Sequence, residues 1–262
     1  MLIFLILISY IFLCWGSFLN VVAYRSITDI SFWQKRSICP NCKKVIFWYD
    51  NIPIVSWIIL KAKCRNCKIQ ISWLYPFIEI LTTVIMTALF CKIFNFNLQN
   101  NLVFNFYLQD ILNFFAYFIF FSVLIIATRT DLQDLVIPQI FSIYLVPIGL
   151  IFSYFNLIKI SFLQSILGAI FGYLILWITA KLFKYFAQKE GLGVGDMELL
   201  ALIGAFLGPI GVWATLLLGS VIGLIIGIFY ILITKQDKSV MIPFGPFLAL
   251  GATIYFFFEN LA

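Results

Sequence analysis

The chain has 262 residues and a net charge of +6, and 63% of its residues are hydrophobic, 19% aromatic and only 11% charged. Soluble domains carry roughly 45–50% apolar and about 25% charged residues. So few charges cannot cover the surface of a water-soluble protein of this size. The composition therefore excludes a soluble enzyme, a disordered chain and a nucleic-acid-binding domain, and it predicts an all-α polytopic membrane protein.

The apolar runs define the predicted spans, since a helix across about 30 Å of hydrocarbon needs about 20 mainly apolar residues. The run over 199–234 is too long for one span, and Gly208-Pro209 is expected to break it into a short helix and a full one. The first run lacks a basic n-region and a small-residue cleavage site, so it is predicted to be a retained span rather than a signal peptide. About eight transmembrane helices result, from the runs 1–24, 75–94, 111–128, 135–158, 160–180, 199–234 and 239–258.

The basic residues predict the orientation of these spans. Residues 23–72 hold nine lysines and arginines against two aspartates, whereas the rest of the chain is nearly neutral. If the N-terminus lies outside and the spans alternate, fifteen basic residues fall inside, and only Lys92 and Lys159 fall outside, with the uncharged loop 95–109. The sequence thus predicts a first transmembrane helix (1–22), a cytoplasmic insert (23–74) beside the anionic lipid surface, and a membrane domain (75–262).

The insert carries four of the six cysteines, in two Cys-x2-Cys pairs separated by 21 residues. Two short turns that each present two thiolates suit a tetrahedral Zn²⁺, and the metal would supply folding energy to an insert too small for a core of its own. We therefore predict a structural, zinc-ribbon-like site, with a redox dithiol as the alternative. The ligands would be Cys39, Cys42, Cys64 and Cys67, whereas Cys14 and Cys91 lie in spans, where a small buried hydrophobe is expected.

Ionisable groups at or within spans are costly, which makes them candidates for function. Asp131 and Asp134 follow the third span, and they share a face if this stretch is helical. The alternative is a solvated helix junction in which Arg129 is their partner. Glu79, near the start of the second span, and Glu259, expected to be a solvated end group, are further candidates.

Asp196 follows three glycines within residues 191–195, which permit a tight or closely packed backbone. The alternative is a flexible turn in which Asp196 is the N-cap of the next span. The predicted topology places Asp196 and the pair Asp131 and Asp134 at the same, cytoplasmic, face of the membrane. Carboxylates from different spans can therefore meet there.

Two adjacent carboxylates suit acid–base chemistry. Both cannot ionise cheaply, so one retains a proton, and the pair can activate water and protonate the carbonyl or the leaving amine. The chain contains no histidine, no Gly-x-Ser-x-Gly elbow, no P-loop and no His-Glu-x-x-His helix, which excludes histidine-dependent triads and zinc proteases of that type.

These segments resemble the type IV prepilin peptidase family of bifunctional leader peptidases and N-methyltransferases, almost from end to end. Asp131, seven residues before Pro138, and Gly193-Val194-Gly195-Asp196 match the two aspartate motifs of the family. The other matching segments are 16–25 (GSFLNVVAYR), 39–42 (CPNC), 48–57 (WYDNIPIVSW), 64–67 (CRNC) and 75–79 (YPFIE).

The resemblance implies an aspartyl endopeptidase of the bacterial inner membrane. Its substrates would be prepilins and pseudopilins, cut after a glycine that ends a short basic leader, and the new N-terminal residue would be methylated with S-adenosylmethionine (SAM). By motif position the catalytic residues are Asp131 and Asp196, and Asp134 is the less suitable member. No residue is assigned to SAM, although Glu79 is a candidate, with a helix-junction carboxylate as the alternative reading. The sequence does not indicate the oligomeric state.

Two positions depart from the family pattern. An acidic or amide residue commonly follows the Ile-Pro, and Gln139, itself an amide, is only a mild change. A lysine commonly stands two residues after the second aspartate, and here it is Glu198. We expect the added negative charge to change the titration of the aspartate pair and the substrate preference.

Two rival readings stay open. In the first, the peptidase is active and the methyltransferase half is not. In the second, the chain is a transporter or scaffold with a zinc-binding adaptor, in which paired acids serve a proton relay. The second rival predicts repeated halves and discontinuous helices near mid-membrane, whereas the sequence has no evident internal repeat.

The predicted fold is a bundle of about eight helices, in which small residues between the helices permit close packing. The glycines expected to serve this purpose are those at 193, 195, 204, 208, 211, 219, 223 and 227.

Overall fold

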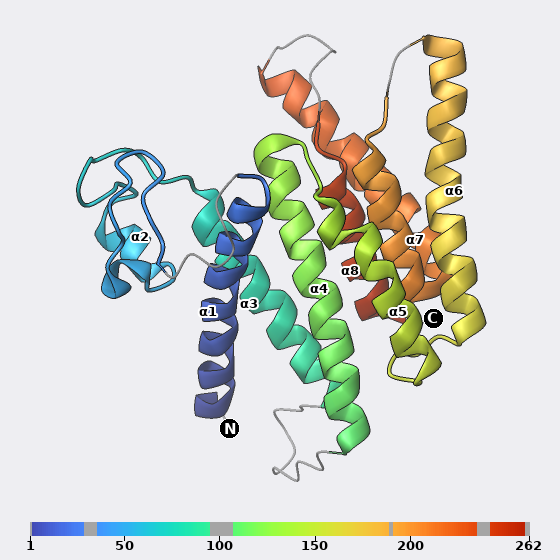
Figure 1. The fold of residues 1–262 in the computed structure, drawn as a ribbon, viewed down its shortest axis with the longest axis horizontal. Coiled ribbons are helices and arrows are strands. Elements are labelled where there is room, and N and C mark those ends of the chain that lie inside the picture. Colours follow the sequence, from blue (N-terminus) through green and yellow to red (C-terminus); the bar gives the residue numbers. More distant parts are fainter. Residues whose placement is uncertain (1, 29–35, 95–106, 189–190, 235–241, 260–262) are drawn as a thin grey trace. The chain divides into compact units, whose positions relative to one another are not determined.

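The computed structural model describes residues 2–28, 36–94, 107–188, 191–234 and 242–259. Within these ranges the chain is all-helical, as predicted, and its only extended pairings are two isolated antiparallel bridges. Most of the polar loop predicted outside the membrane, residues 95–106, lies outside the described residues. The helices separate into two compact units, Met1–Phe114 and Phe115–Ala262, and Figure 1 shows their elements in chain order.

Five helices of the described residues are long and apolar enough to cross a membrane: α1 (Leu2–Ser26), α3 (Leu74–Ile93), α4 (Leu108–Asp134), α6 (Phe162–Ala187) and α7 (Val194–Thr234). The shorter helices α5 (Val146–Tyr154) and α8 (Gly245–Phe258) are also apolar. The chain is therefore a multi-pass membrane protein. The count of eight spans and the domain boundaries stay predictions.

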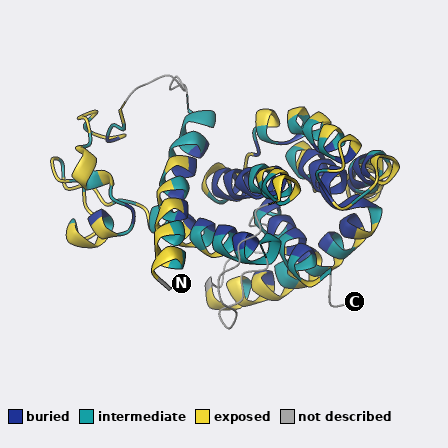
Figure 2. Cartoon of the chain, turned by 90° about the horizontal axis from the view of Figure 1, so that it is seen from below, coloured by how far each residue is buried: buried dark blue, intermediate teal, exposed yellow. Residues whose placement is uncertain are grey.

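In the first unit, α1 and α3 pack side by side and run in opposite directions (Figure 1). Two polar contacts fix their alignment: Ser9 Oγ lies 3.2 Å from Thr87 Oγ1, and Asn20 Nδ2 donates to the Tyr75 carbonyl over 3.1 Å. The insert between these helices holds only the 3-10 turn η1 (Trp48–Asn51) and the short helix α2 (Val55–Ile59). Figure 2 shows that most of its residues are exposed or half-buried, as expected for a segment without a core of its own.

In the second unit, α7 is the helix on which the others pack. Gly168 and Gly172 of α6 lie directly against its backbone, and a Cβ on Gly168 would come within 2.2 Å of the Gly204 carbonyl oxygen. Ser165 Oγ donates to the Ala205 carbonyl over 2.6 Å at the same crossing. α4 joins the core through aromatic contacts, of which Phe120 on Phe206 of α7 and Tyr117 on Phe256 of α8 have ring centroids 4.7 and 4.5 Å apart.

The break predicted at Gly208-Pro209 is confirmed. Gly208 has φ 71° and ψ −178°, a backbone conformation open to glycine, and it divides α7 into two helical segments. Pro209 follows at the start of the second segment, where its missing N–H is tolerated.

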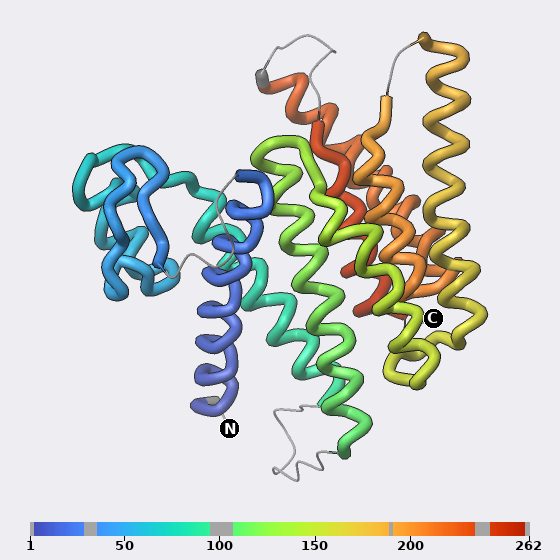
Figure 3. Tube along the Cα trace, viewed as in Figure 1, coloured from blue at the N-terminus to red at the C-terminus, as the bar shows by residue number. Residues whose placement is uncertain are grey.

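The run 135–158, predicted as one transmembrane helix, is not a continuous helix. Leu135 has φ 56°, and Pro138 begins two 3-10 turns, η2 (Gln139–Phe141) and η3 (Ile143–Leu145), before the nine-residue α5 starts. Figure 3 traces this connection from α4 to α5. This apolar run does not form one helix because prolines interrupt it. The buried Ser142 also has a non-helical backbone conformation, with φ −123° and ψ −92°.

Candidate active site and metal site

Asp131 lies in the last turn of α4 and is only 5% exposed. Its Oδ2 accepts a hydrogen bond from the backbone N–H of Gly245, the first residue of α8, over 2.9 Å. The carboxylate therefore lies at the N-terminal end of a helix, where free N–H groups and the helix dipole favour a negative charge.

Asp196 also lies at a helix N-terminus. α7 begins at Val194 rather than within the apolar run, so Asp196 lies in the first turn and is not the N-cap that the alternative reading required. Its carboxylate accepts a hydrogen bond from the backbone N–H of Gly193, just before the helix. This reach back from the third helical position is one half of a capping box, and it explains why the helix starts five residues before the apolar run that begins at Leu199.

The fold brings Asp131 and Asp196 close enough for the charge of one to act on the other. Ile137 packs against Gly195 and Gly245, a glycine next to Asp196 and the glycine whose N–H holds Asp131. A Cβ on Gly195 would lie 2.9 Å from Ile137 Cβ, and one on Gly245 would lie 2.9 Å from Ile137 Cδ1 and 2.8 Å from Asp131 Oδ2. Glycines at 195 and 245 thus let one apolar side chain fit between the helix ends that hold the two carboxylates.

Asp134 does not join this pair. It is exposed, and its Oδ2 accepts a hydrogen bond from Gln133 over 3.3 Å, although the helix does continue through residues 131–134. Arg129 is buried at 2% exposure and donates to Gln133 Oε1 over 2.6 Å. Glu259 lies at the end of α8, where its Oε1 accepts from the Tyr255 hydroxyl over 3.4 Å.

The two positions that depart from the family pattern face each other. Gln139 Nε2 donates to Glu198 Oε1 over 2.8 Å, and Ser142 Oγ donates to Glu198 Oε2 over 2.7 Å. Glu198 is 5% exposed and Ser142 is fully buried. Each carboxylate oxygen of Glu198 therefore has a neutral donor from the segment that follows Asp131.

The four cysteines of the insert form one cluster. The sulfur atoms of Cys39, Cys42, Cys64 and Cys67 all lie within 4.8 Å of one another, and those of Cys39 and Cys67 are 3.8 Å apart. Tetrahedral zinc with Zn–S bonds of about 2.3 Å separates its sulfurs by about 3.8 Å. The donor set and its spacing thus fit a structural metal with no open position. Cys14, expected to be buried, is exposed on α1, and Cys91 is half-buried on α3.

Both Cys-x2-Cys turns have the same backbone design. In the first, Cys39 N–H donates to the Lys44 carbonyl over 2.9 Å, and in the second Cys64 N–H donates to the Ile69 carbonyl over 2.8 Å. Lys43 and Lys68, each directly after the second cysteine of its turn, have φ of 56° and 60°. The N–H of Ile69 is also the main cause that lowers the pKa of Cys67 to about 6, which favours the metal-binding thiolate.

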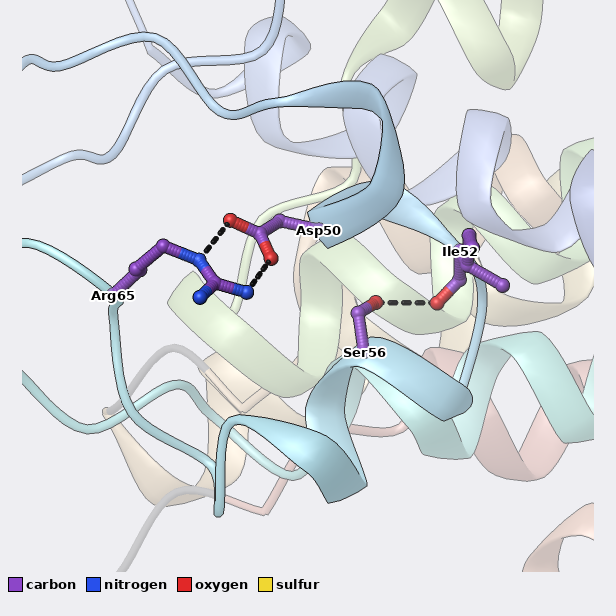
Figure 4. Close-up of polar contacts among 4 residues, drawn as sticks. All are labelled: Asp50, Ile52, Ser56 and Arg65. Atoms are coloured by element: carbon purple, nitrogen blue, oxygen red, sulfur yellow. Dashed lines mark hydrogen bonds and ion pairs between the residues drawn. The ribbon is translucent and has the colours of Figure 1, made fainter.

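An ion pair joins the second cysteine turn to the remainder of the insert, as Figure 4 shows. Arg65 Nε and Nη2 donate to Asp50 Oδ2 and Oδ1 over 2.8 and 2.6 Å, and Asp50 raises the pKa of Arg65. The guanidinium also lies over the ring of Tyr49, 5.5 Å from its centre. In the same view the Ser56 hydroxyl donates to the Ile52 carbonyl, at the start of α2.

Glu79 connects the insert to the membrane helices. Its Oε2 accepts the backbone N–H of Ile54 over 2.8 Å, and Ser17 of α1 is a further hydrogen-bond partner. Ile54 has φ 60° and ψ −51° and lies at the centre of a γ-turn closed by Val55 N–H on the Pro53 carbonyl over 2.6 Å. Such a turn is strained for a β-branched residue and persists only when its surroundings hold it.

Sequence reasoning missed Gly245, Ile137 and the pairing of Gln139 and Ser142 with Glu198. Pro243-Phe244-Gly245-Pro246 carries a usable signal, because proline and glycine just before an apolar run mark a helix start. That signal locates the N-terminus of α8 but not the carboxylate 114 residues away that it contacts.

Comparison with known proteins identifies the family of the chain. Residues 11–93 match the bacterial Peptidase A24 N-terminal domain, and residues 118–228 match the Type IV leader peptidase family. No solved structure matches the chain.

Three curated relatives, all named prepilin leader peptidase/N-methyltransferase, illustrate the similarity. The protein of Aeromonas hydrophila is 34% identical, over 91% of this chain and 85% of its own length. That of Pseudomonas aeruginosa is 34% identical over 83% and 70%, and that of Legionella pneumophila 30% identical over 94% and 88%. The chain therefore belongs to the type IV leader peptidase family.

Proposed function

We propose that the chain is a membrane aspartyl endopeptidase that removes the basic leader of prepilins and pseudopilins after glycine. We further propose that it acts at the cytoplasmic face of the bacterial inner membrane and N-methylates the new N-terminal residue with SAM. Membership of the family makes the chain a peptidase and methyltransferase. The observation that supports the aspartyl chemistry is that Asp131 of α4 and Asp196 of α7 lie within electrostatic reach of each other, each at the N-terminus of a helix.

The reaction needs one proton shared between the two carboxylates. The ionised member takes a proton from a water molecule, which attacks the carbonyl carbon of the scissile bond, while the protonated member donates to the carbonyl oxygen. The carboxylate that gained the proton then gives it to the leaving amine. Because the two groups titrate as a pair, the base and acid roles belong to the pair rather than to either residue.

Zinc is proposed as the metal of the four-cysteine cluster, with a structural role. Four thiolates complete its coordination, so it would hold the two cysteine turns together without offering a site for water or substrate. SAM would supply the methyl group for the second reaction. That half of the proposal rests on family membership, since no described residue is assigned to SAM.

The test is cleavage of a prepilin in membranes or nanodiscs, read by mass spectrometry. We expect Asp131→Asn and Asp196→Asn each to lower the cleavage rate by about 10²–10⁴-fold or more, because either change removes a member of the acid–base pair. The matched control is Asp134→Asn, which changes an exposed aspartate of the same helix turn and should cut normally.

SAM separates the two activities in the same assay. Its addition should increase the mass of the mature pilin by about 14 Da, the mass of one methylene. Normal cleavage without this increase would leave a peptidase alone. Normal cleavage by both asparagine variants would remove the assignment of Asp131 and Asp196 as the acid–base pair, although the chain would still be a peptidase.

A further inference from the structure

Glu198 is a buried carboxylate that the proposed chemistry does not use. It lies one and a half turns into α7, two residues after Asp196, and its two oxygens accept from Gln139 Nε2 at 2.8 Å and Ser142 Oγ at 2.7 Å. Both donors belong to the irregular segment 135–145 that connects Asp131 to α5. An ionised carboxylate is costly to bury without such donors, so these contacts hold the segment on α7.

The same segment carries Ile137, which lies against Gly195 of α7 and Gly245 of α8. Gly195 and Glu198 are three residues apart and therefore share one face of α7; Gly195 contacts Ile137, and Glu198 contacts Gln139 and Ser142. Residues 195–198 of α7 thus contact both ends of segment 137–142. A shift of this segment would move Ile137 against Gly245, the residue whose N–H holds the Asp131 carboxylate.

We propose that Glu198 is a positioning residue of the peptidase site: with Gln139 and Ser142 it clamps segment 137–142 to α7 and so sets the separation of Asp131 and Asp196. The inference rests on the proposed function and goes beyond it, because Glu198 touches neither aspartate through a hydrogen bond in the described structure. The clamp needs one carboxylate and one amide facing each other. It does not specify which of the two positions carries the charge.

Because either position could carry the carboxylate, the proposal can be tested by exchanging the side chains of residues 139 and 198. Gln139→Glu alone sets two carboxylates against each other, and Glu198→Gln alone replaces the acceptor by a second amide. The double variant Gln139→Glu/Glu198→Gln restores an amide–carboxylate pair with the donor on α7. We expect Gln139→Glu to lower kcat for prepilin cleavage by about tenfold or more, with KM little changed, and the double variant to recover most of that loss.

The controls separate positioning from folding. Each variant is assayed as the full-length protein in nanodiscs for thermal unfolding and for SAM-dependent methylation of an already cleaved pilin, and Asp134→Asn serves as the matched change at an exposed carboxylate. Positioning predicts a loss in kcat that exceeds any loss of folded protein, with SAM-dependent methylation unchanged. If Gln139→Glu fails to fold, Ser142→Ala and Glu198→Gln remain as milder tests, each expected to lower kcat by several-fold.

The result that overturns the clamp is a lack of coupling: either the single variants cut like the wild type, or the double variant is no better than the product of the single effects. A loss of cleavage that follows the loss of folded protein and of methylation also overturns it. Asp131→Asn and Asp196→Asn are assayed in parallel. If these two cut normally, the proposed function fails; if they are inactive and the swap shows no rescue, the clamp alone fails.

Discussion

At the scale of single residues, the candidate site depends on backbone groups as much as on side chains. Asp131 and Asp196 both accept backbone N–H groups at the start of a helix, from Gly245 and Gly193. Such hydrogen bonds to a carboxylate are stronger than neutral ones and fix its direction. Glycine at 245 is also required by space, since any Cβ there would meet the carboxylate that its own N–H holds.

The prediction at this scale is Gly245→Ala. The added methyl group would lie 2.8 Å from Asp131 Oδ2 and 2.9 Å from Ile137 Cδ1, both ends of side chains that can move. Because alanine at a helix start costs little and these atoms can yield, we expect unfolding to change by less than about 1 kcal/mol. The carboxylate is displaced, however, so cleavage should fall by about tenfold or more.

Cleavage kinetics and thermal unfolding of the same preparation check this prediction. Gly193→Ala is the matched control near the other aspartate, because its Cβ would make an ordinary 3.4 Å contact with Asp196 Oδ2. Equal losses of activity in the two variants, or a Gly245→Ala protein that cuts normally, would show that space at residue 245 does not govern the site.

At the scale of helices, the apolar runs located the membrane-embedded stretches but not the ends of the helices. α4 continues to Asp134 and α7 begins at Val194, so both aspartates lie inside helices whose predicted ends exclude them. A search for uncharged apolar runs ends at the first charged residue, so it misses the end of a helix that a charged residue caps. The break at Gly208-Pro209 was predictable, because its cause lies in two adjacent residues.

Contacts between helices were less accessible from the sequence. Gly204 was expected at a close approach, and the structure confirms it, but its partner Gly168 on α6 was not identified, nor was Gly172, which lies against Leu200. The pairing of Gln139 with Glu198 joins residues 59 positions apart. Composition and spacing report which residues are unusual, whereas only the fold reports which of them meet.

The α6–α7 crossing gives the prediction at this scale, Gly168→Ala. The new Cβ would lie 2.2 Å from the Gly204 carbonyl oxygen and 2.8 Å from Gly208 Cα, and these backbone atoms can move only if the helices separate. Alanine favours an isolated helix by about 1 kcal/mol over glycine, but overpacking costs about 1–3 kcal/mol or more. We therefore expect a net loss of thermal stability.

Thermal unfolding in nanodiscs measures that loss. Gly227→Ala on α7 is the control, because among the described residues its Cβ would meet only the end of the Ile242 side chain, at 3.3 Å, and it keeps the same helix-propensity gain. A Gly168→Ala protein as stable as the Gly227→Ala protein would contradict the close approach of α6 to α7.

At the scale of the whole molecule, the candidate metal site and the candidate acid–base pair lie in different units of the chain. The four-cysteine cluster and the Glu79 junction belong to Met1–Phe114, whereas both aspartates and their glycine partners belong to Phe115–Ala262. The insert that holds the cluster is mostly exposed and has little core. Its order should therefore depend on the metal, and that of the second unit should not.

Metal removal tests this division. After treatment with a strong chelator, we expect hydrogen exchange to increase in the described part of the insert, residues 36–72, and at the start of α3 beside Glu79, while α4, α7 and α8 keep their protection. Metal analysis of Cys39→Ser and Cys64→Ser should show the same loss. Cys91→Ser is the control, since Cys91 lies outside the cluster and should retain the metal. Unchanged exchange in the insert after the metal has gone would contradict a structural role.

The hydrogen bond from Gly245 to Asp131 can form only late in the synthesis of the protein. The ribosome makes Asp131 first, Asp196 65 residues later and the N–H that holds Asp131 only after 114 residues. Until α8 has been translated and inserted, the nascent chain carries Asp131 and Asp196 without the backbone N–H that orients the Asp131 carboxylate. A translation product that stops before α8 therefore lacks the N–H that holds the Asp131 carboxylate, and its candidate site is incomplete.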